Sequence, residues 1–326
     1  MSAPSLSEIR LVVLGRSGAG KSATVRTILG LQQDSAALRH DECSKHTGQA
    51  AGRQVTIVSS SDWFGSGCIP EDRRRQLSSL LALSSPGPHV FLLCVPLNQP
   101  ADGEAKAVDV LEKLLGPAVV QNNTMVMFTN TEELDQEEGL EDYLLTWRKD
   151  LTELVRRCGD RYHTLETQPG RAEPEEVVQE LLDKVDEVVK ESGAEHFSCQ
   201  LYQDTEEQIQ TRQREIIRQR QADGVDSEDL EGVRREAESS IGDLDLDINA
   251  LFPCSDMPVS PARSFLRGLW EMLTGWVWKL PKLVRGEALL GALVGLFVGG
   301  PVGGAVGATV GSVATEVGRR KTQKTK

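Results

Sequence analysis

The first 190 residues alternate between short apolar runs and longer segments with one apolar face. Runs of strand length occupy residues 9–14, 53–58, 90–97, 124–129 and 161–165. Helical spacing of apolar positions marks residues 70–83, 105–115, 141–157 and 174–191. The continuous apolar runs are typical of strands buried on both faces. This alternation predicts an α/β fold over residues 8–193, with a mostly parallel sheet and helices on both faces.

A glycine-rich loop directly follows the first predicted strand. It consists of Gly15, Arg16, Ser17, Gly18, Ala19, Gly20, Lys21 and Ser22, with Ala23 continuing into a helical pattern. The loop fits G-x-x-x-x-G-K-[ST], in which curled backbone N–H groups and the helix N-terminus bind phosphates. Lys21 is placed for the β- and γ-phosphates and Ser22 for Mg²⁺. The motif therefore predicts a nucleotide site at residues 15–23, with Ser22 as the metal ligand.

The two switch segments of a phosphate-loop GTPase have expected places after this loop. Residues 32–52 are polar and lack clear periodicity, as a first switch would. Ser59 and Asp62 stand where such proteins carry the Asp and Gly of Asp-x-x-Gly. A serine replaces the Mg²⁺-binding carboxylate, and an aspartate near the γ-phosphate would repel it. We therefore expect weakened Mg²⁺ binding and slow or absent hydrolysis, and we assign no catalytic residue.

Base recognition is expected at the end of the strand 124–129. There Thr129, Asn130 and Glu132 occupy the position of the guanine-reading Asn/Thr-Lys-x-Asp. The Glu132 carboxylate is one methylene longer than aspartate and still suits guanine N1 and N2. Asn130 replaces the usual lysine, so the identity of the base stays open.

Beyond the α/β region the chain changes character twice. Residues 194–237 are highly charged and helical in pattern. They are either a solvated helix or a partner-binding coiled coil, although no sustained heptad is visible. Residues 238–262 are acidic and then rich in Pro and Ser, as expected for a linker.

Charge is distributed unevenly along the chain. The net charge is −13, yet residues 261–326 contain ten Lys or Arg against three Glu. A basic end on an acidic body favours a membrane surface as partner, whereas a nucleic-acid binder would carry its basic patch on the folded domain. Six scattered cysteines without C-x-x-C spacing indicate reduced cytosolic thiols, with neither a zinc site nor a disulfide framework.

The C-terminal region combines two apolar segments. Over residues 263–287, leucines and three tryptophans at helical spacing are flanked by Lys and Arg, as in an interfacial helix. Residues 288–315 lack any charge, and as a helix they would span about 42 Å. Glycines recur every fourth residue from Gly291 to Gly311, around Pro301. We expect residues 263–317 to associate with a membrane as a single span, a hairpin or a surface helix, followed by a basic tail at 318–326. A flexible tail or a helix tucked against the domain is the alternative.

Several motifs together resemble the GTPase IMAP (immunity-associated, avirulence-induced-like) family over residues 8–205. They are the loop motif within residues 10–29, Gly52 to Val55 leading to Trp63-Phe64, the box from Pro96 through Leu115, Met127 to Thr129, and Cys158-Gly-x-Arg-Tyr-His163. The resemblance implies a septin-like G domain of the TRAFAC class that binds GTP or GDP with Mg²⁺. The family carries Asp-Thr-Pro-Gly where this chain has Ser59 to Asp62, and usually Asn-Asn where it has Glu166-Thr167. Glu166 thereby becomes a further candidate for base binding, and the first-switch threonine falls on His40.

Three hypotheses follow for the whole chain. The first is a guanine-nucleotide-binding protein on the cytoplasmic face of an intracellular membrane, whose nucleotide controls assembly with itself or with related GTPases. The second is a pseudo-GTPase scaffold that oligomerises through its helical and glycine-rich C-terminal segments. The third is a membrane-active protein whose glycine-rich segment inserts on demand from a soluble pool.

Overall fold

One six-stranded sheet forms the centre of the protein. The computed structural model describes residue 6 and residues 8–31, 43–64, 68–131, 139–165, 174–222 and 229–252. The chain divides into two compact units, 1–256 and 257–326, and every described residue belongs to the first. The strands are β1 Glu8–Leu14, β2 Ser44–Ala50, β3 Arg53–Ser59, β4 Val90–Pro96, β5 Thr124–Thr129 and β6 Tyr162–Thr164. The helices are α1 Lys21–Leu29, α2 Pro70–Ser84, α3 Asp102–Leu115, α4 Ala118–Asn123, α5 Leu140–Trp147, α6 Lys149–Arg157, α7 Pro174–Ser192, α8 Gln200–Ala222, α9 Leu230–Ser240 and α10 Ile248–Leu251.

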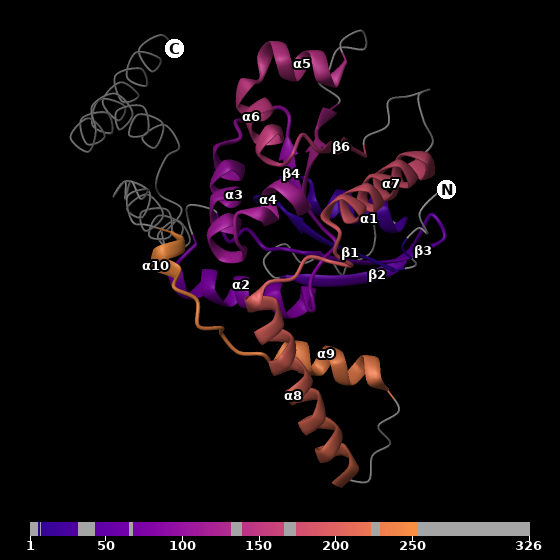
Figure 1. Ribbon diagram of the computed structural model, residues 1–326, viewed down its shortest axis with the longest axis vertical. Coiled ribbons are helices and arrows are strands. Elements are labelled where there is room, and N and C mark those ends of the chain that lie inside the picture. The colour runs from indigo at the N-terminus through magenta and orange to yellow at the C-terminus, as the bar shows by residue number, and fades with distance from the viewer. Residues whose placement is uncertain are drawn as a thin grey trace, which may run out of the picture. The chain divides into compact units, whose positions relative to one another are not determined.

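The strand order is β2-β3-β1-β4-β5-β6 (Figure 1). All neighbouring strands are parallel except β2 and β3, which form an antiparallel pair. This arrangement confirms the predicted α/β fold with a mostly parallel sheet. The carboxyl ends of β1, β3, β4 and β5 lie at one edge of the sheet, where such folds place ligands.

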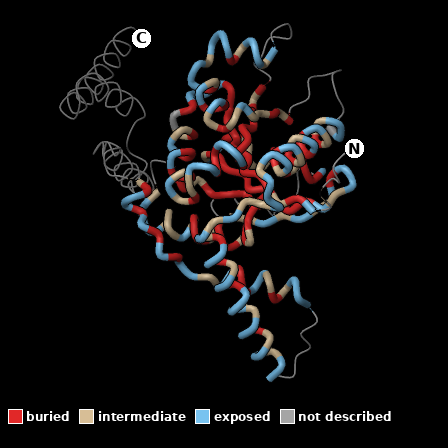
Figure 2. Tube along the Cα trace, in the orientation of Figure 1, coloured by how far each residue is buried: buried red, intermediate tan, exposed pale blue. Residues whose placement is uncertain are grey.

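Helices cover both faces because side chains along each strand alternate between them. On β1, Ile9, Leu11 and Val13 pack with α1 and α7. Val12 and Leu14 point to the other face, where they share a core with residues of α2, α3 and α6. The sheet is therefore buried on both sides, and Figure 2 shows this concentration of buried positions at the centre.

Two local features differ from the expectations. The polar stretch at 32–52 contains β2, an edge strand whose side chains alternate between exposed and half-buried positions. The polar sequence of β2 gives no apolar pattern that would predict a strand, and backbone pairing with β3 stabilises it. The expected helix at 141–157 is interrupted at Arg148, whose guanidinium donates to the carbonyl oxygens of Leu97 and Gln99 and pairs with Asp150 at 2.8 Å.

The charged extension packs onto the α/β domain. Tyr202 of α8 is 1% exposed, and its hydroxyl lies 2.8 Å from that of Ser84 at the end of α2. Further along α8, Ile209 and Ile216 form a small core with α9. The structure thus differs from both expected alternatives, since the apolar positions of α8 are buried within the same chain.

Part of the expected linker is folded as well. Leu244, Leu246, Ile248 and Leu251 are buried, and the Leu244 N–H donates to the Ser78 hydroxyl of α2 at 2.9 Å. The linker prediction for residues 238–262 is therefore wrong over 238–252. Its apolar residues were obscured by intervening aspartates, which remain exposed at Asp243, Asp245 and Asp247.

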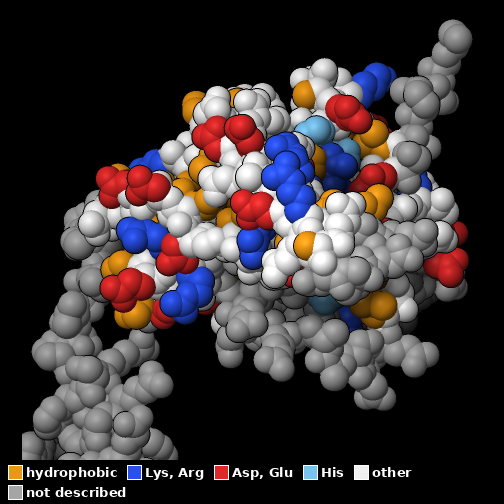
Figure 3. All heavy atoms as spheres, turned by 90° about the horizontal axis from the view of Figure 1, so that it is seen from below, with side chains coloured by type: hydrophobic (Ala, Val, Ile, Leu, Met, Phe, Trp, Pro, Cys, Tyr) orange, Lys and Arg blue, Asp and Glu red, His pale blue; other side chains and the backbone are white. Residues whose placement is uncertain are grey.

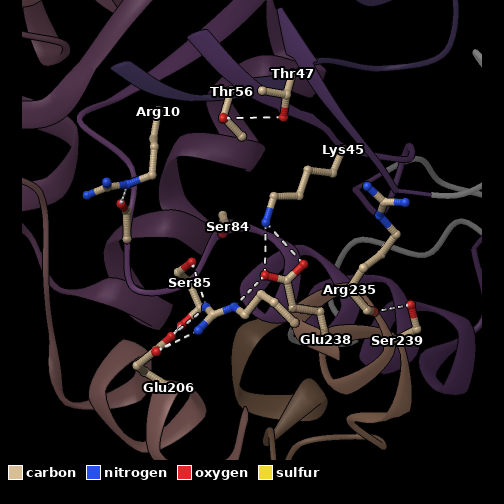
Figure 4. A network of polar contacts seen from close by, with 12 residues as sticks. Arg10, Lys45, Thr47, Thr56, Ser84, Ser85, Glu206, Arg235, Glu238 and Ser239 are labelled. Carbon is tan, nitrogen blue, oxygen red and sulfur yellow. Dashed lines mark hydrogen bonds and ion pairs between the residues drawn. The ribbon is translucent and has the colours of Figure 1, made fainter. Parts of the chain in front are cut away.

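A network of ion pairs fastens the extension to the sheet (Figure 4). Glu238 of α9 pairs with Lys45 of β2 and with Arg234, both at 2.8 Å. Arg234 also pairs with Glu206 of α8 at 2.7 Å, and Glu206 accepts a hydrogen bond from the Ser85 hydroxyl. Burial opposes ionisation of Glu206, but the bonds from Arg234 and Ser85 outweigh it and lower its pKa. The network links β2, the end of α2, α8 and α9.

The surface on the side of α8 and α9 carries mixed charges. Figure 3 shows Lys and Arg side chains interspersed with Asp and Glu over this face. Arg220 of α8 pairs with Glu236 of α9 at 2.6 Å, for example. Within the described part of the chain, no helix has the length and apolar character needed to cross a membrane. The predicted membrane segment at 263–317 lies outside that part.

Candidate nucleotide-binding site

The glycine-rich loop connects β1 to α1 at the carboxyl edge of the sheet. Its backbone at Gly20 has φ of 84°, and a Cβ placed there would lie 2.8 Å from Cγ2 of Thr129. Only glycine meets both conditions without strain. Thr129, at the end of β5, donates from its hydroxyl to the Ala19 carbonyl at 3.1 Å. Thr129, expected at the base site, therefore also supports the loop.

Lys21 begins α1 and turns its side chain back into the loop. Its Nζ donates to the carbonyl oxygens of Gly15 at 2.6 Å and Arg16 at 2.9 Å. Burial lowers the pKa of this ammonium, whereas the nearby carboxylates of Asp62 and Glu104 raise it. The ammonium group of Lys21 is thus held by carbonyl oxygens of the loop itself. The predicted metal ligand Ser22 follows it as the second residue of α1.

Arg16 ties the loop to α3. Its Nε lies 2.9 Å from Oε1 of Glu104, and its Nη2 donates to the Pro100 carbonyl at 3.2 Å. Glu104 is fully buried, and this burial raises its pKa against the opposing effect of Arg16. Glu104 was not among the site residues predicted from the sequence. A lone acidic residue on the apolar face of a helix, three residues before Ala107 and four before Val108, was the available signal.

The second-switch segment lies directly on the loop. After β3, the Ser60 N–H donates to the Val13 carbonyl at 2.9 Å, which holds this segment beside β1. Oδ2 of Asp62 then accepts a hydrogen bond from the Ser17 N–H at 3.0 Å. Ser59 is buried at the end of β3. The structure therefore brings Asp62 to a backbone donor of the loop that is expected to serve a phosphate.

The expected base side is described only in part. Asn130 follows β5 with φ of 57°, and its Nδ2 donates to Oδ1 of Asn98 at 3.3 Å. Glu132 and Glu166 lie outside the described residues. Their predicted roles at the base stay predictions.

The donor set fits phosphates better than it fits a metal ion. Backbone N–H groups, Lys21 and the start of α1 converge on the loop, which is the arrangement that binds phosphate oxygens. Among the described residues, no group of three or more His, Cys, Asp or Glu side chains is arranged to hold a metal ion. Ser22 is the residue that the loop motif predicts as the ligand of a magnesium ion. The arrangement can bind and orient a nucleotide, and no described side chain is assigned to activate water.

The chain is similar in sequence to proteins of one family. The model of the AIG1 family matches residues 9–216. GTPase IMAP family member 8 of Mus musculus is 30% identical over 196 residues, covering 59% of this chain and 28% of that protein. Immune-associated nucleotide-binding protein 9 of Arabidopsis thaliana is 28% identical over 206 residues, covering 61% and 60%. The chain thus spans less than a third of the mouse relative.

Among solved structures, Toc33 of Arabidopsis thaliana in complex with GDP and Mg²⁺ is similar in fold. Its TM-score is 0.45 at 15% sequence identity, and the match covers 57% of this chain and 86% of that one.

Proposed function

Because the chain belongs to the AIG1 family, we propose that it binds guanine nucleotides through its glycine-rich loop. The relatives are named as GTPases and nucleotide-binding proteins, which supports a nucleotide as the ligand. Mg²⁺ accompanies the nucleotide and is bound weakly, because Ser59 replaces the carboxylate of the second switch. The site consists of residues 15–23 for the phosphates and of Thr129, Asn130, Glu132 and Glu166 for the base.

The observation that carries this proposal is the position of Lys21. Its ammonium is bound to two carbonyl oxygens of the loop, at the N-terminus of α1. Folding holds this charge in place at the cost of partial burial, which a purely structural loop would not need. A bound phosphate supplies the compensating negative charge.

Equilibrium binding to the full chain in mild detergent tests the proposal. Fluorescent GDP, GTP and ADP analogues are titrated with and without Mg²⁺. We expect micromolar binding of at least one guanine nucleotide, weakened at least a hundredfold in Lys21→Ala. Lys113→Ala, which removes an exposed lysine from α3, is the matched control and should bind as the wild type does. Preferential ADP binding by the wild type would contradict the assignment of guanine. If the wild type bound none of the nucleotides, the proposed nucleotide site would be contradicted.

The proposal extends to assembly at a membrane. Residues 263–317 attach the chain to the cytoplasmic face of an intracellular membrane, and the nucleotide controls assembly with itself or with related GTPases. The uncharged run at 288–315 and its basic flanks support attachment. Carbonate extraction of the full chain distinguishes an inserted segment, which stays in the pellet, from surface binding. A soluble pool of full-length protein would instead favour insertion on demand.

A pseudo-GTPase scaffold is the second candidate. Ser59 at the Mg²⁺ position and Asp62 on the loop favour it, since both oppose hydrolysis. The double variant Ser59→Asp and Asp62→Gly restores the Asp and Gly of the second switch. Its GTP turnover distinguishes a nucleotide-binding GTPase site from a pseudo-GTPase scaffold. Mg²⁺-dependent GTP turnover in a variant that melts as the wild type does would indicate a local loss in an otherwise intact site, whereas no turnover would favour the scaffold.

A further inference from the structure

Asp62 is held in place from both sides. The Ser60 N–H is bonded to the Val13 carbonyl on one side. On the other side, Trp63 is fully buried, stacks edge-on against Phe64, and accepts a hydrogen bond from Arg73 Nε at its carbonyl oxygen. The backbone that carries Asp62 is therefore fixed beside the loop.

The contact that Asp62 makes is one that a phosphate oxygen would make. Its Oδ2 is 3.0 Å from the Ser17 nitrogen, in the loop whose backbone N–H groups serve phosphates. Its Oδ1 is shielded from solvent and has no hydrogen-bond partner among the described residues. Oδ1 of Asp62 can therefore accept a further hydrogen bond, as a phosphate oxygen at the same place could.

In phosphate-loop GTPases, the position of Asp62 lies beside the γ-phosphate. The residue three after the end of β3 is the glycine whose N–H contacts the γ-phosphate in proteins with Asp-x-x-Gly, and here it is Asp62. Asp62 keeps this backbone N–H but adds a side-chain acceptor, which already takes the N–H of Ser17 in the loop. Glu104, fully buried beside Arg16, adds a second carboxylate to the surroundings of Lys21.

The choice between a nucleoside diphosphate and a triphosphate rests on the proposed nucleotide binding. We infer that the Asp62 carboxylate takes the place of the γ-phosphate, so that the loop accepts a nucleoside diphosphate and disfavours a triphosphate. A third phosphate would have to displace the carboxylate from Ser17 and lie beside its charge, and like charges this close in a partly buried site repel strongly. A diphosphate needs neither change.

The ratio of GTP to GDP affinity tests the inference. The full chain in mild detergent is titrated calorimetrically with GDP and with a non-hydrolysable GTP analogue in Mg²⁺. The wild type should bind GDP at least a hundredfold more tightly than the analogue. Asp62→Gly, which removes both the charge and the blocking group, should reduce this ratio to about tenfold or less.

Two further variants separate charge from occupancy and control for folding. Asp62→Asn keeps the size and an oxygen for Ser17, so it should reduce the ratio only in part. Asp72→Asn removes a half-exposed carboxylate from α2 and should leave the wild-type ratio unchanged.

A wild-type ratio near one would overturn the inference and leave the proposed function standing, and this result needs no variant to fold. An unchanged preference for GDP in both Asp62 variants would overturn it as well. If neither nucleotide bound to the wild type, the proposed function and the inference would both fail.

Discussion

At the scale of single residues, Gly20 and Thr129 shape the phosphate loop together. A side chain at Gly20 would adopt an unfavourable φ and meet the Thr129 methyl. Gly20→Ala should therefore lower the free energy of unfolding by about 2–4 kcal/mol, from the backbone penalty and overpacking combined. Urea denaturation measures the loss.

Thr129→Ser provides the matched background for this change. It deletes the methyl group and keeps the hydroxyl that donates to Ala19. The cost of Gly20→Ala should be smaller by roughly 1 kcal/mol in this background, as expected for residues in contact. Equal costs in both backgrounds would show that the methyl contact contributes nothing.

His89 is expected to make stability depend on pH. This buried side chain accepts the Arg10 N–H at Nδ1, at 2.8 Å, so it must be neutral there. Burial, followed by the charge of Arg10, lowers its pKa to about 4. An unfolded histidine has a pKa near 6.5, so the unfolded state binds the proton first as the pH falls.

The free energy of unfolding should thus decrease from about pH 6.5 and level off near pH 4, by at most about 3 kcal/mol from this residue. His89→Asn keeps an acceptor for Arg10 and cannot titrate in this range. Urea denaturation at pH 7 and pH 5 should show a smaller difference in the variant. An identical difference in both proteins would assign the effect to other groups.

At the scale of elements, a buried tyrosine contributes to the docking of α8 on α2. The Ser84 hydroxyl donates to the Leu80 carbonyl at 2.6 Å, so the Tyr202 hydroxyl is the donor to Ser84. Tyr202→Phe removes this bond while the ring keeps its contact with Phe197. We expect a loss of about 1 kcal/mol in the free energy of unfolding.

Denaturant unfolding of Tyr202→Phe is compared with that of Tyr162→Phe, a change at a partly exposed tyrosine of β6. The second variant should lose less. If both variants matched the wild type, the hydroxyl contact would not contribute to docking of α8.

At the scale of the whole molecule, Glu238 holds the extension against β2, the strand within the expected first switch. Its side chain is 1% exposed and forms ion pairs with both Lys45 and Arg234. Glu238→Gln leaves Lys45 without its carboxylate partner and Arg234 with Glu206 alone, so we expect docking of α9 to weaken by about 2 kcal/mol. Hydrogen exchange should then accelerate over residues 230–240.

Glu236→Gln on the same helix is the matched control. Glu236 is half exposed and pairs with Arg220 across α8 and α9. Exposed ion pairs contribute at most about 1 kcal/mol, so exchange should change little. Equal acceleration in both variants would contradict a special role for the buried carboxylate.

The sequence by itself determined the alternating strands and helices, the loop of residues 15–22 and the family. These features depend on hydrophobic periodicity and on a contiguous motif, and both are local properties of the chain. The substitutions Ser59 and Asp62 were visible for the same reason, because they occupy positions counted from the end of a strand.

Only the tertiary structure decided which distant residues meet. Asp62 binds Ser17, Glu104 pairs with Arg16, and Thr129 supports Ala19 through contacts that join separate elements. The polar strand β2 and the folded residues 241–252 were missed because their stability comes from backbone pairing and burial against α2, which leave little trace in local composition. Long-range packing thus placed the Asp62 carboxylate on the Ser17 N–H of the phosphate loop. The sequence predicted only that Asp62 would lie near the γ-phosphate.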